Sequence, residues 1–460
     1  MIRFYLGLWA SKFLLFLLKL RKQEQDDKPG LLAYRFHKNF MNKIKKPEIV
    51  IAVTGTNGKT TASHLIAMMY KNLGKKVCYN DWGANQLAGH ARCLLDCVTI
   101  FNKPKVDVVV LETDELTAHV TFPAMQPNYV VVTNICRDSI RRNANTYHIF
   151  RRMQMGVESV PNATLILNAD CPISSFLGYN EKNKKVYYGV KGKKDNTKYI
   201  ADDFAFCPKC YSKIEYVYRQ YRHIGQVKCP KCGFKSLKSD YLVTNYSKNK
   251  KELTVKTSKG TEKFPTISSS IFNIYNQAAV ITLFKEDGYK DTEIRKAIKG
   301  VKIPKSRESI EIVNGIKVIS LLAKGQNVSA CSTVFRELGN ETEDMAIVFL
   351  MNEMYGKDEI METVTWYYET DFEFLNKDHI KQILFAGPRN MDYKLRLKLA
   401  GFKDDKYTCI DKDEDLYKYI DYKKVKKVYF LYEVEAVSKA LRIKDNFCER
   451  IKKEMKENED

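Results

Sequence analysis

Residues 53–62 read VTGTNGKTTA, and this short stretch decides the fold of the chain. The residues before it, 48–53, form a mostly apolar, β-branched run typical of a buried parallel strand. The residues after it, 60–74, carry apolar side chains at helical spacing. The glycines at 55 and 58 allow a tight turn that points backbone N–H groups at an anion. The stretch therefore predicts a phosphate-binding loop between a strand and a helix of an α/β fold.

The loop also supplies side chains for a nucleoside triphosphate. Lys59 offers a point charge for phosphate, and the Thr60 hydroxyl is a suitable ligand for Mg²⁺. The spacing is G-x-x-G-K-T, two residues shorter after the first glycine than the common G-x-x-x-x-G-K-[ST] pattern. This difference argues against the ordinary GTPase and kinase families. The predicted nucleotide-binding residues here are Gly55, Thr56, Asn57, Gly58, Lys59, Thr60 and Thr61.

Three more strand-like runs end in polar residues. Residues 106–115, 127–138 and 163–172 are apolar and then deliver Glu112, Asn134 and Asp170 respectively. A single such residue is often only a helix cap, but a series of strand ends favours a ligand site at one edge of a parallel sheet.

The overall composition is that of a globular protein with a basic surface. The 460 residues are enough for two or three domains, and 77 basic against 55 acidic residues give a net charge of +22. This charge fits a polyanionic partner or simply a lysine-rich composition. The twelve cysteines, without a secretory cleavage pattern, predict a reduced, cytoplasmic protein.

Residues 1–22 are apolar but carry basic residues at Arg3, Lys12 and Lys19. Lys12 would be costly inside a spanning helix. A helix lying on an anionic membrane surface fits better, and a helix packed on the core of the protein or a true span remains open. Residues 23–30 are expected to form a polar linker.

Residues 201–240 interrupt the α/β pattern with two C-P-x-C knuckles. Cys207, Cys210, Cys229 and Cys232 have the spacing of a closed tetrahedral zinc site, with a short hairpin expected between the knuckles. Four protein ligands leave no open position, so the predicted Zn²⁺ is structural. His223 lies within the insert and is expected at the surface.

The last third predicts a second α/β domain. Residues 302–312 are interpreted as a hinge, and strands are expected within 317–323, 344–352, 382–387 and 427–433. The charged tail from about residue 442 is expected to be a solvated helix. The predicted domains are thus a segment at 1–47, an ATP-binding domain at 48–300 with its insert, and an α/β domain at 301–460.

The motifs VTGTNGKTT, LETDE, LNAD and FNIYNQAAV, in this order, resemble the central domain of the Mur ligase family. The cysteine insert, residues 82–85 (WGAN) and the last domain resemble a branch of that family, the ligase-like subunits of lipid II isoglutaminyl synthases. The resemblance implies a Mur ligase-type P-loop central domain with an inserted zinc ribbon, followed by a Rossmann-like α/β domain. It covers nearly the whole chain.

What this resemblance implies is an ATP-dependent amidation of lipid II at the inner face of the cell membrane. Lys59 would stabilise the transferred phosphate, and Thr60 with Glu112 would hold Mg²⁺. Asp170, Asn273, Asn276 and Arg307 are candidate nucleotide contacts, and Asn134 and Arg137 candidate substrate contacts. Segments 137–149 and 323–329, and Ser306, depart from the family pattern and leave the substrate contacts open.

The chain lacks a recognisable glutaminase nucleophile, so the resemblance implies a separate GatD-like glutaminase in a heterodimer. The last domain would dock it and lend an acid to its catalytic pair, with Glu369, Asp371 and Asp358 as candidates. Two alternatives remain: an amino-acid ligase of the Mur or folylpolyglutamate type, and a zinc-ribbon ATPase that binds nucleic acid. The favoured interpretation expects no nucleic acid.

Overall fold

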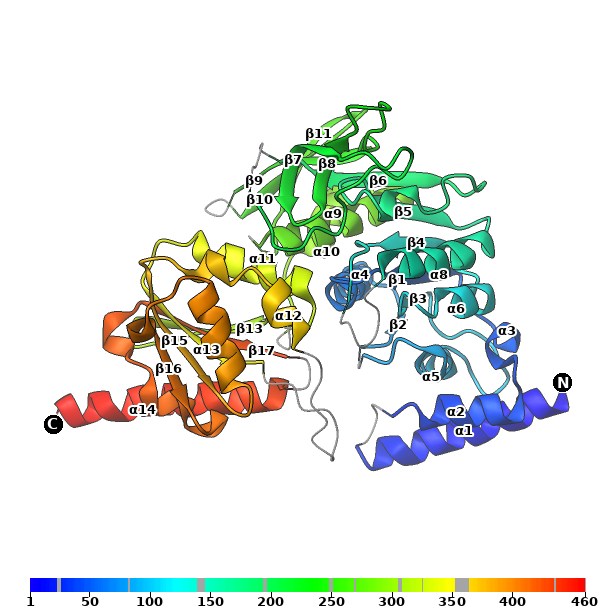
Figure 1. Cartoon of the computed structure of the whole chain (residues 1–460). Helices are drawn as coiled ribbons and strands as arrows, with labels where there is room; N and C mark the ends of the chain where they lie inside the picture. The colour runs from blue at the N-terminus through cyan, green and yellow to red at the C-terminus, as the bar shows by residue number, and fades with distance from the viewer. Residues whose placement is uncertain are drawn as a thin grey trace. The chain divides into compact units, whose positions relative to one another are not determined.

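The computed structural model describes residues 1–22, 26–81, 83–138, 145–192, 197–247, 251–268, 270–304, 308–324, 326–351, 364–433 and 436–459. The chain forms two compact units. The first comprises Met1–Cys136, Asn145–Asn196 and Asp203–Ile303, and the second comprises Arg137–Ala144, Thr197–Asp202 and Pro304–Asp460. Each unit is built on its own sheet flanked by helices (Figure 1).

The sheet of the first unit has the strand order β11-β10-β9-β6-β5-β4-β1-β3-β2 in the described part of the chain. The strands from β2 to β9 in that order run parallel, and β9, β10 and β11 pair antiparallel. The bounds are β1 Ile49–Thr54, β2 Val77–Tyr79, β3 Val108–Glu112, β4 Tyr129–Val132, β5 Thr164–Asn168, β6 Lys185–Val190, β9 Tyr241–Ser247, β10 Glu252–Thr257 and β11 Gly260–Pro265. The parallel α/β architecture predicted from the sequence is confirmed.

Helices cover both faces of this sheet. One layer contains α5 (Leu87–Cys97), α6 (Ala118–Met125) and α8 (Thr146–Glu158), and the other contains α4 (Lys59–Asn72), α9 (Ile271–Glu286) and α10 (Asp291–Ile298). Because strand side chains alternate between faces, Val50 and Ala52 of β1 pack in the first layer, and Ile51 and Val53 in the second. This burial on both faces explains why the strands are continuous apolar runs.

The described residues before β1 form three helices: α1 (Ile2–Leu20), α2 (Lys28–Phe36) and α3 (Phe40–Lys43). The expectation of a linker through residue 30 is wrong for its last part, because α2 begins at Lys28 with Pro29 in its first turn, a favourable position for proline. A β-carbon on Gly30 would lie 1.9 Å from the carbonyl oxygen of Ala88, so glycine permits α2 to pack closely on α5. Among the described helices, none is long and apolar enough to cross a membrane.

In its described residues, the second unit has a six-stranded sheet of order β12-β13-β17-β14-β15-β16, parallel except for β12 with β13. Its strands are β12 Glu308–Val313, β13 Ile316–Leu322, β14 Met345–Leu350, β15 Ile380–Ala386, β16 Tyr407–Ile410 and β17 Lys427–Tyr432. Its helices are α11 Val328–Gly339, α12 Thr365–Glu369, α13 Asn390–Leu399 and α14 Val437–Glu459. The strands expected within 317–323, 344–352, 382–387 and 427–433 are all found, each with bounds within a few residues.

Two expectations for this unit are wrong in part. The segment interpreted as a hinge, 302–312, is a strand in its last part, because residues 308–312 belong to β12, which pairs along its whole length with β13. The charged tail is not simply solvated, because Ile443, Phe447 and Ile451 of α14 are fully buried against the sheet. Charged residues on the other positions of α14 masked this apolar stripe in the sequence.

Candidate functional site

The phosphate loop lies at the carboxyl end of β1 and continues directly into α4. Gly55 (φ 122°) and Gly58 (φ 89°) both have left-handed backbones that other residues rarely adopt. A β-carbon on Gly55 would lie 2.3 Å from Oγ1 of Thr133, and one on Gly58 would lie 2.4 Å from Oδ1 of Asn276. Glycine is therefore required at both positions by conformation and by close contacts. Thr60 and Thr61 form the first turn of α4 with Lys59.

Lys59 is held in place by three oxygen atoms. Its Nζ atom donates to the carbonyl of Gly55 at 2.6 Å, to that of Thr56 at 3.3 Å and to Oε2 of Glu115 at 2.8 Å. Burial by itself would lower the pKa of Lys59, but the carboxylates of Glu115 and Glu112 outweigh that effect and raise it. The lysine is therefore a fixed positive charge at the floor of the loop.

Glu112 ends β3 beside the loop, and its backbone is fixed by two side chains that the sequence did not single out. Asn80 accepts from the Glu112 N–H at 2.8 Å and donates to its carbonyl at 2.9 Å. His90 of α5 lies 2.8 Å from the same carbonyl through Nε2, and because a carbonyl only accepts, this nitrogen carries the proton. Burial lowers the pKa of His90 to about 4, so the ring is neutral near pH 7.

The segment after β4 braces the phosphate loop. Oγ1 of Thr133 donates to the carbonyl of Asn57 at 2.6 Å, and Nδ2 of Asn134 donates to the same oxygen at 3.0 Å. The N–H of Thr56 donates to the Asn134 carbonyl at 2.8 Å, and Oγ1 of Thr56 pairs with the backbone of Cys136. Asn134 thus lies at the loop, where it remains a candidate substrate contact.

Arg137 is the other predicted substrate contact. It belongs to the second unit, where its Nη1 atom donates to Oε2 of Glu369 at 3.1 Å. The structure therefore pairs one of the predicted substrate contacts with one of the candidate acids for the glutaminase. Asp371, the other described candidate acid, is buried and accepts from the N–H of Ile200 at 2.7 Å.

The two asparagines at the start of α9 lie near the phosphate loop. Asn276 approaches Gly58, and its Nδ2 atom donates to Oδ1 of Asn273 at 3.4 Å. The sequence motif therefore brings a pair of amides close to the phosphate loop, where they remain candidate nucleotide contacts. Arg307 and Asp358 lie outside the described residues.

Asp170 has a different environment from the one expected of a nucleotide contact. The side chain is fully buried, and it accepts from Tyr218 and Gln226 of the insert and from Tyr275 of α9, each at 2.8 Å. The N–H of Val190 is a fourth donor at 2.7 Å. Protein donors therefore occupy both carboxylate oxygens, and the observed contacts tie the insert to the end of β5.

A second contact of the insert was also missed. The expectation that His223 is exposed is wrong, because the side chain is 1% exposed and Nε2 lies 3.6 Å from Sγ of Cys171. Burial would raise the pKa of Cys171, but the hydrogen bond to His223 outweighs it and lowers that pKa to about 7. The turn between β7 (Glu215–Tyr221) and β8 (Ile224–Lys228) is therefore anchored in the core.

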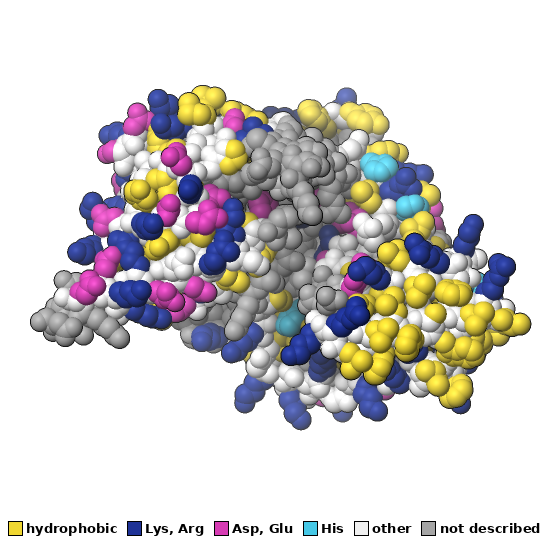
Figure 2. Space-filling view, turned by 90° about the horizontal axis from the view of Figure 1, so that it is seen from below, with side chains coloured by type: hydrophobic (Ala, Val, Ile, Leu, Met, Phe, Trp, Pro, Cys, Tyr) yellow, Lys and Arg dark blue, Asp and Glu magenta, His cyan; other side chains and the backbone are white. Residues whose placement is uncertain are grey.

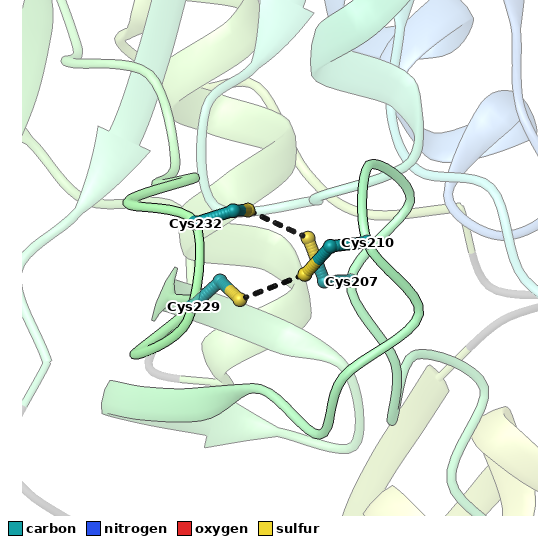
Figure 3. A group of neighbouring side chains, drawn as sticks. All are labelled: Cys207, Cys210, Cys229 and Cys232. Carbon is teal, nitrogen blue, oxygen red and sulfur yellow. Dashed lines mark hydrogen bonds between the residues drawn. The ribbon is translucent and has the colours of Figure 1, made fainter.

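The insert contains the hairpin predicted between the two cysteine knuckles, since β7 and β8 pair antiparallel. The Sγ atoms of Cys207, Cys210, Cys229 and Cys232 all lie within 4.8 Å of one another. Figure 3 shows the four side chains converging, with Cys207 facing Cys232 and Cys210 facing Cys229, each pair 3.5 Å apart. Four thiols converging in this way fit the donor set of a tetrahedral zinc site.

Comparisons with known proteins agree with this architecture. The Mur ligase middle domain model matches residues 53–284, and the MurT ligase C-terminal model matches residues 325–436. The chain is 26% identical over 432 residues to the MurT subunit of a lipid II isoglutaminyl synthase from Streptococcus pneumoniae, covering 93% of each chain. It is 27% identical over 380 residues to the corresponding Staphylococcus aureus subunit, covering 81% of this chain and 83% of the relative.

The fold is also shared with a solved structure of low sequence identity. A pseudomurein peptide ligase type C from Methanothermus fervidus superposes with a TM-score of 0.63 at 21% identity, covering 88% of this chain and 79% of that one. The fold of this chain is therefore one already known from solved structures. The chain belongs to the Mur ligase family, and within it to the branch defined by the MurT C-terminal domain.

Proposed function

We propose that this chain is the ATP-using subunit of a lipid II isoglutaminyl synthase. It would phosphorylate the α-carboxylate of D-glutamate in the stem peptide of lipid II, releasing ADP. Ammonia would then attack the acyl phosphate, forming the C–N bond of isoglutamine as phosphate leaves. The observation that carries this proposal is the phosphate loop with its buried lysine in a chain whose last domain matches MurT.

The described side chains suit the phosphoryl transfer. Lys59 is positively charged and close to the loop backbone, so it can stabilise charge on the transferred phosphate. Thr60 and Glu112 offer a hydroxyl and a carboxylate, the hard oxygen ligands that Mg²⁺ prefers. Bound there, Mg²⁺ would offset negative charge on the phosphates. Asn134, Asn273 and Asn276 are positioned near the loop to contact substrate or nucleotide.

We assign a structural Zn²⁺ to the four thiols of the insert. The ribbon contributes its own small core of Ile214, Val227 and Phe234 around the knuckles. So small a cluster is insufficient to order forty residues, and a metal supplies the missing stability. The closed ligand set leaves no position for a substrate.

Ammonia must come from a partner, which we take to be a GatD-like glutaminase docked on the second unit. Glu369 is the stronger candidate for the acid lent to that partner, because it is about a quarter exposed, whereas Asp371 is only 2% exposed. The substrate carries a lipid anchor, so we place the reaction at the cytoplasmic face of the cell membrane.

The test is a reconstitution with the purified chain, the candidate glutaminase, glutamine, ATP and lipid II. The expected product is a stem peptide whose mass differs by the replacement of one hydroxyl by one amino group, and its formation should require glutamine and ATP. Ammonium salts should replace glutamine and partner. ATP turnover with unchanged lipid II would instead support a ligase for another carboxylate, and stimulation by RNA or DNA would support a nucleic-acid ATPase.

A further inference from the structure

Helix α1 is apolar on two opposite faces. One face is buried at intervals of three or four residues, at Phe4, Leu8, Ser11, Leu15 and Leu18. Phe4, Leu8 and Leu15 belong to the core of the first unit. The opposite face repeats the same spacing in solvent, with Ile2, Leu6, Trp9, Phe13, Phe16 and Leu20 between 46% and 80% exposed. A surface helix normally has a polar outer face, so this second stripe requires a separate explanation.

Lys12 does not interrupt the exposed stripe, although the sequence suggested that it would. Its Nζ atom turns inward and donates to the carbonyls of Leu95 and Val98, at 2.7 and 2.6 Å. These oxygens belong to the end of α5, where a cation is favourable. Burial, with the neighbouring charge of Lys105, lowers the pKa of Lys12 to about 8. The only charge in the middle of α1 is thus removed from the outer face.

A nearby loop extends the same surface. Ile100 and Phe101 are 53% and 68% exposed, and the carbonyl of Ile100 accepts from Nε1 of Trp9 at 2.9 Å. The loop is stiffened by a bridge between Val98 and Pro104 on either side of it. The exposed side chains of α1 together with Ile100 and Phe101 are called the α1 face below.

The surroundings of the α1 face are strongly basic. Residues 1–46 contain eleven lysines and arginines against three acidic residues, and residues 1–22 contain no acid. Arg3, Lys19, Arg21 and Lys22 are all exposed on or next to α1. Figure 2 shows hydrophobic side chains gathered over the region of α1 and α2, with Lys and Arg side chains around them.

We propose that the α1 face inserts its apolar side chains into the headgroup region of an anionic phospholipid bilayer. The inference rests on the proposed function in one respect: a chain that acts on lipid II is expected to meet a membrane. Exposed aromatic and aliphatic side chains surrounded by cations match an interfacial helix that lies in the plane of the bilayer. A second copy of the chain is a poorer partner, because a two-fold contact would bring the basic surroundings against themselves.

The experiment is co-sedimentation of the full chain with vesicles, without lipid II, ATP or glutaminase. Vesicles of phosphatidylcholine containing phosphatidylglycerol are compared with vesicles of phosphatidylcholine alone. The double variant Phe13→Ser/Phe16→Ser removes two exposed rings of the α1 face. Its matched control, Met391→Ser/Leu399→Ser, removes two apolar side chains of α13 in the second unit that are at least as exposed as the two rings.

The Phe13→Ser/Phe16→Ser variant should bind anionic vesicles at least about tenfold more weakly, because each ring that enters the bilayer removes apolar area from water. The α13 control should bind within about twofold of the parent chain. Binding of the parent should weaken but persist at high salt, since insertion is not screened as the basic charge is. Purely electrostatic binding that both double variants retain would overturn the proposal, as would dimerisation through the α1 face in place of vesicle binding.

A second assay separates this inference from the proposed function. Amidation of lipid II dispersed in detergent does not need a bilayer, so Phe13→Ser/Phe16→Ser should retain the parent rate there within about twofold. If the parent chain binds vesicles through the α1 face but shows no amidation, the proposed function fails and the membrane face stands. If amidation proceeds and no form binds vesicles, the membrane face fails alone.

Discussion

The Nζ atom of Lys59 lies 2.8 Å from Oε2 of Glu115, and the two side chains are only 11% and 4% exposed. The pair joins the first residue of α4 to the loop after β3. A nucleotide phosphate would therefore meet a lysine that already has a buried carboxylate partner. This one ion pair therefore affects both the stability of the fold and the handling of phosphate. Variants of the two residues can separate these effects.

We expect Lys59→Ala to lower ATP turnover by about 10²–10³-fold, because a fixed charge at the transferred phosphate is lost. The variant should also lose about 3 kcal/mol of stability, since Glu115 remains buried without its cation. Lys59→Ala/Glu115→Gln should recover much of the stability and none of the turnover. Exposed Lys75 serves as the control, and Lys75→Ala should change neither. Normal turnover in Lys59→Ala would refute the phosphate role.

The second prediction concerns pH. His90 is neutral in the folded chain because burial lowers its pKa to about 4, while the unfolded chain takes up a proton near the ordinary value. The stabilisation of the folded state by the neutral ring is complete above the ordinary pKa of histidine, and it is lost as the pH falls towards 4. When the pH is lowered from about 7.5 to about 5, His90 should lower the free energy of unfolding by about 2 kcal/mol.

The variant that tests it is His90→Gln, whose amide can still donate to the Glu112 carbonyl but does not titrate. Urea unfolding at the two pH values should show a pH dependence smaller by about 2 kcal/mol than in the parent chain. An unchanged difference would mean that His90 does not control this part of the acid sensitivity.

The sequence predicted the parts of this molecule that depend on local pattern. The phosphate loop, the parallel strands and the ribbon cysteines follow from glycine placement, apolar runs and C-x-x-C spacing, which act over a few residues. Glu115 and His90 were missed because their roles come from elements brought together by the fold: Glu115 meets a lysine 56 residues earlier in the chain. His223 was missed because a histidine in a hairpin turn carries no local sign that the fold will bury it against Cys171.

Asp170 provides a test of how a sequence motif should be interpreted. The sequence suggested a nucleotide contact, whereas the described contacts connect the insert, β6 and α9. Asp170→Asn should place an NH₂ group opposite at least one hydrogen-bond donor that now contacts a carboxylate oxygen. This change should lower the stability by about 1–3 kcal/mol. Tyr275→Phe, which removes one donor, should cost less. A loss of ATP affinity at unchanged stability in Asp170→Asn would instead favour the nucleotide contact.

Removing the metal should lower the stability of the ribbon rather than act directly on the reaction. We expect Cys207→Ser to reduce bound zinc from about one equivalent to near zero, because a tetrahedral site loses one thiolate. The thermal unfolding midpoint should fall as the ribbon loosens. Cys409→Ser, at a cysteine in β16 of the second unit, is the control and should retain the metal. A normal midpoint in a metal-free Cys207→Ser variant would show that the metal is not structural.

The two described candidate acids of the second unit should differ in effect. Glu369→Gln removes an accessible carboxylate, so glutamine-dependent amidation should fall by at least about tenfold while ammonium-dependent amidation persists. Asp371→Asn instead disturbs a buried acceptor for Ile200, so it should lower stability by about 1–3 kcal/mol and reduce both activities alike.

Arg137→Gln is the matched control for Glu369, since it breaks the same ion pair and keeps the carboxylate. If Glu369 serves the partner directly, Arg137→Gln should not reproduce the selective loss of glutamine-dependent turnover. If Arg137 contacts the substrate, as its position after β4 suggested, its variant should lower the ammonium-dependent rate as well. Identical selective losses in both variants would show that the ion pair, rather than the acid itself, is what the glutaminase reaction requires.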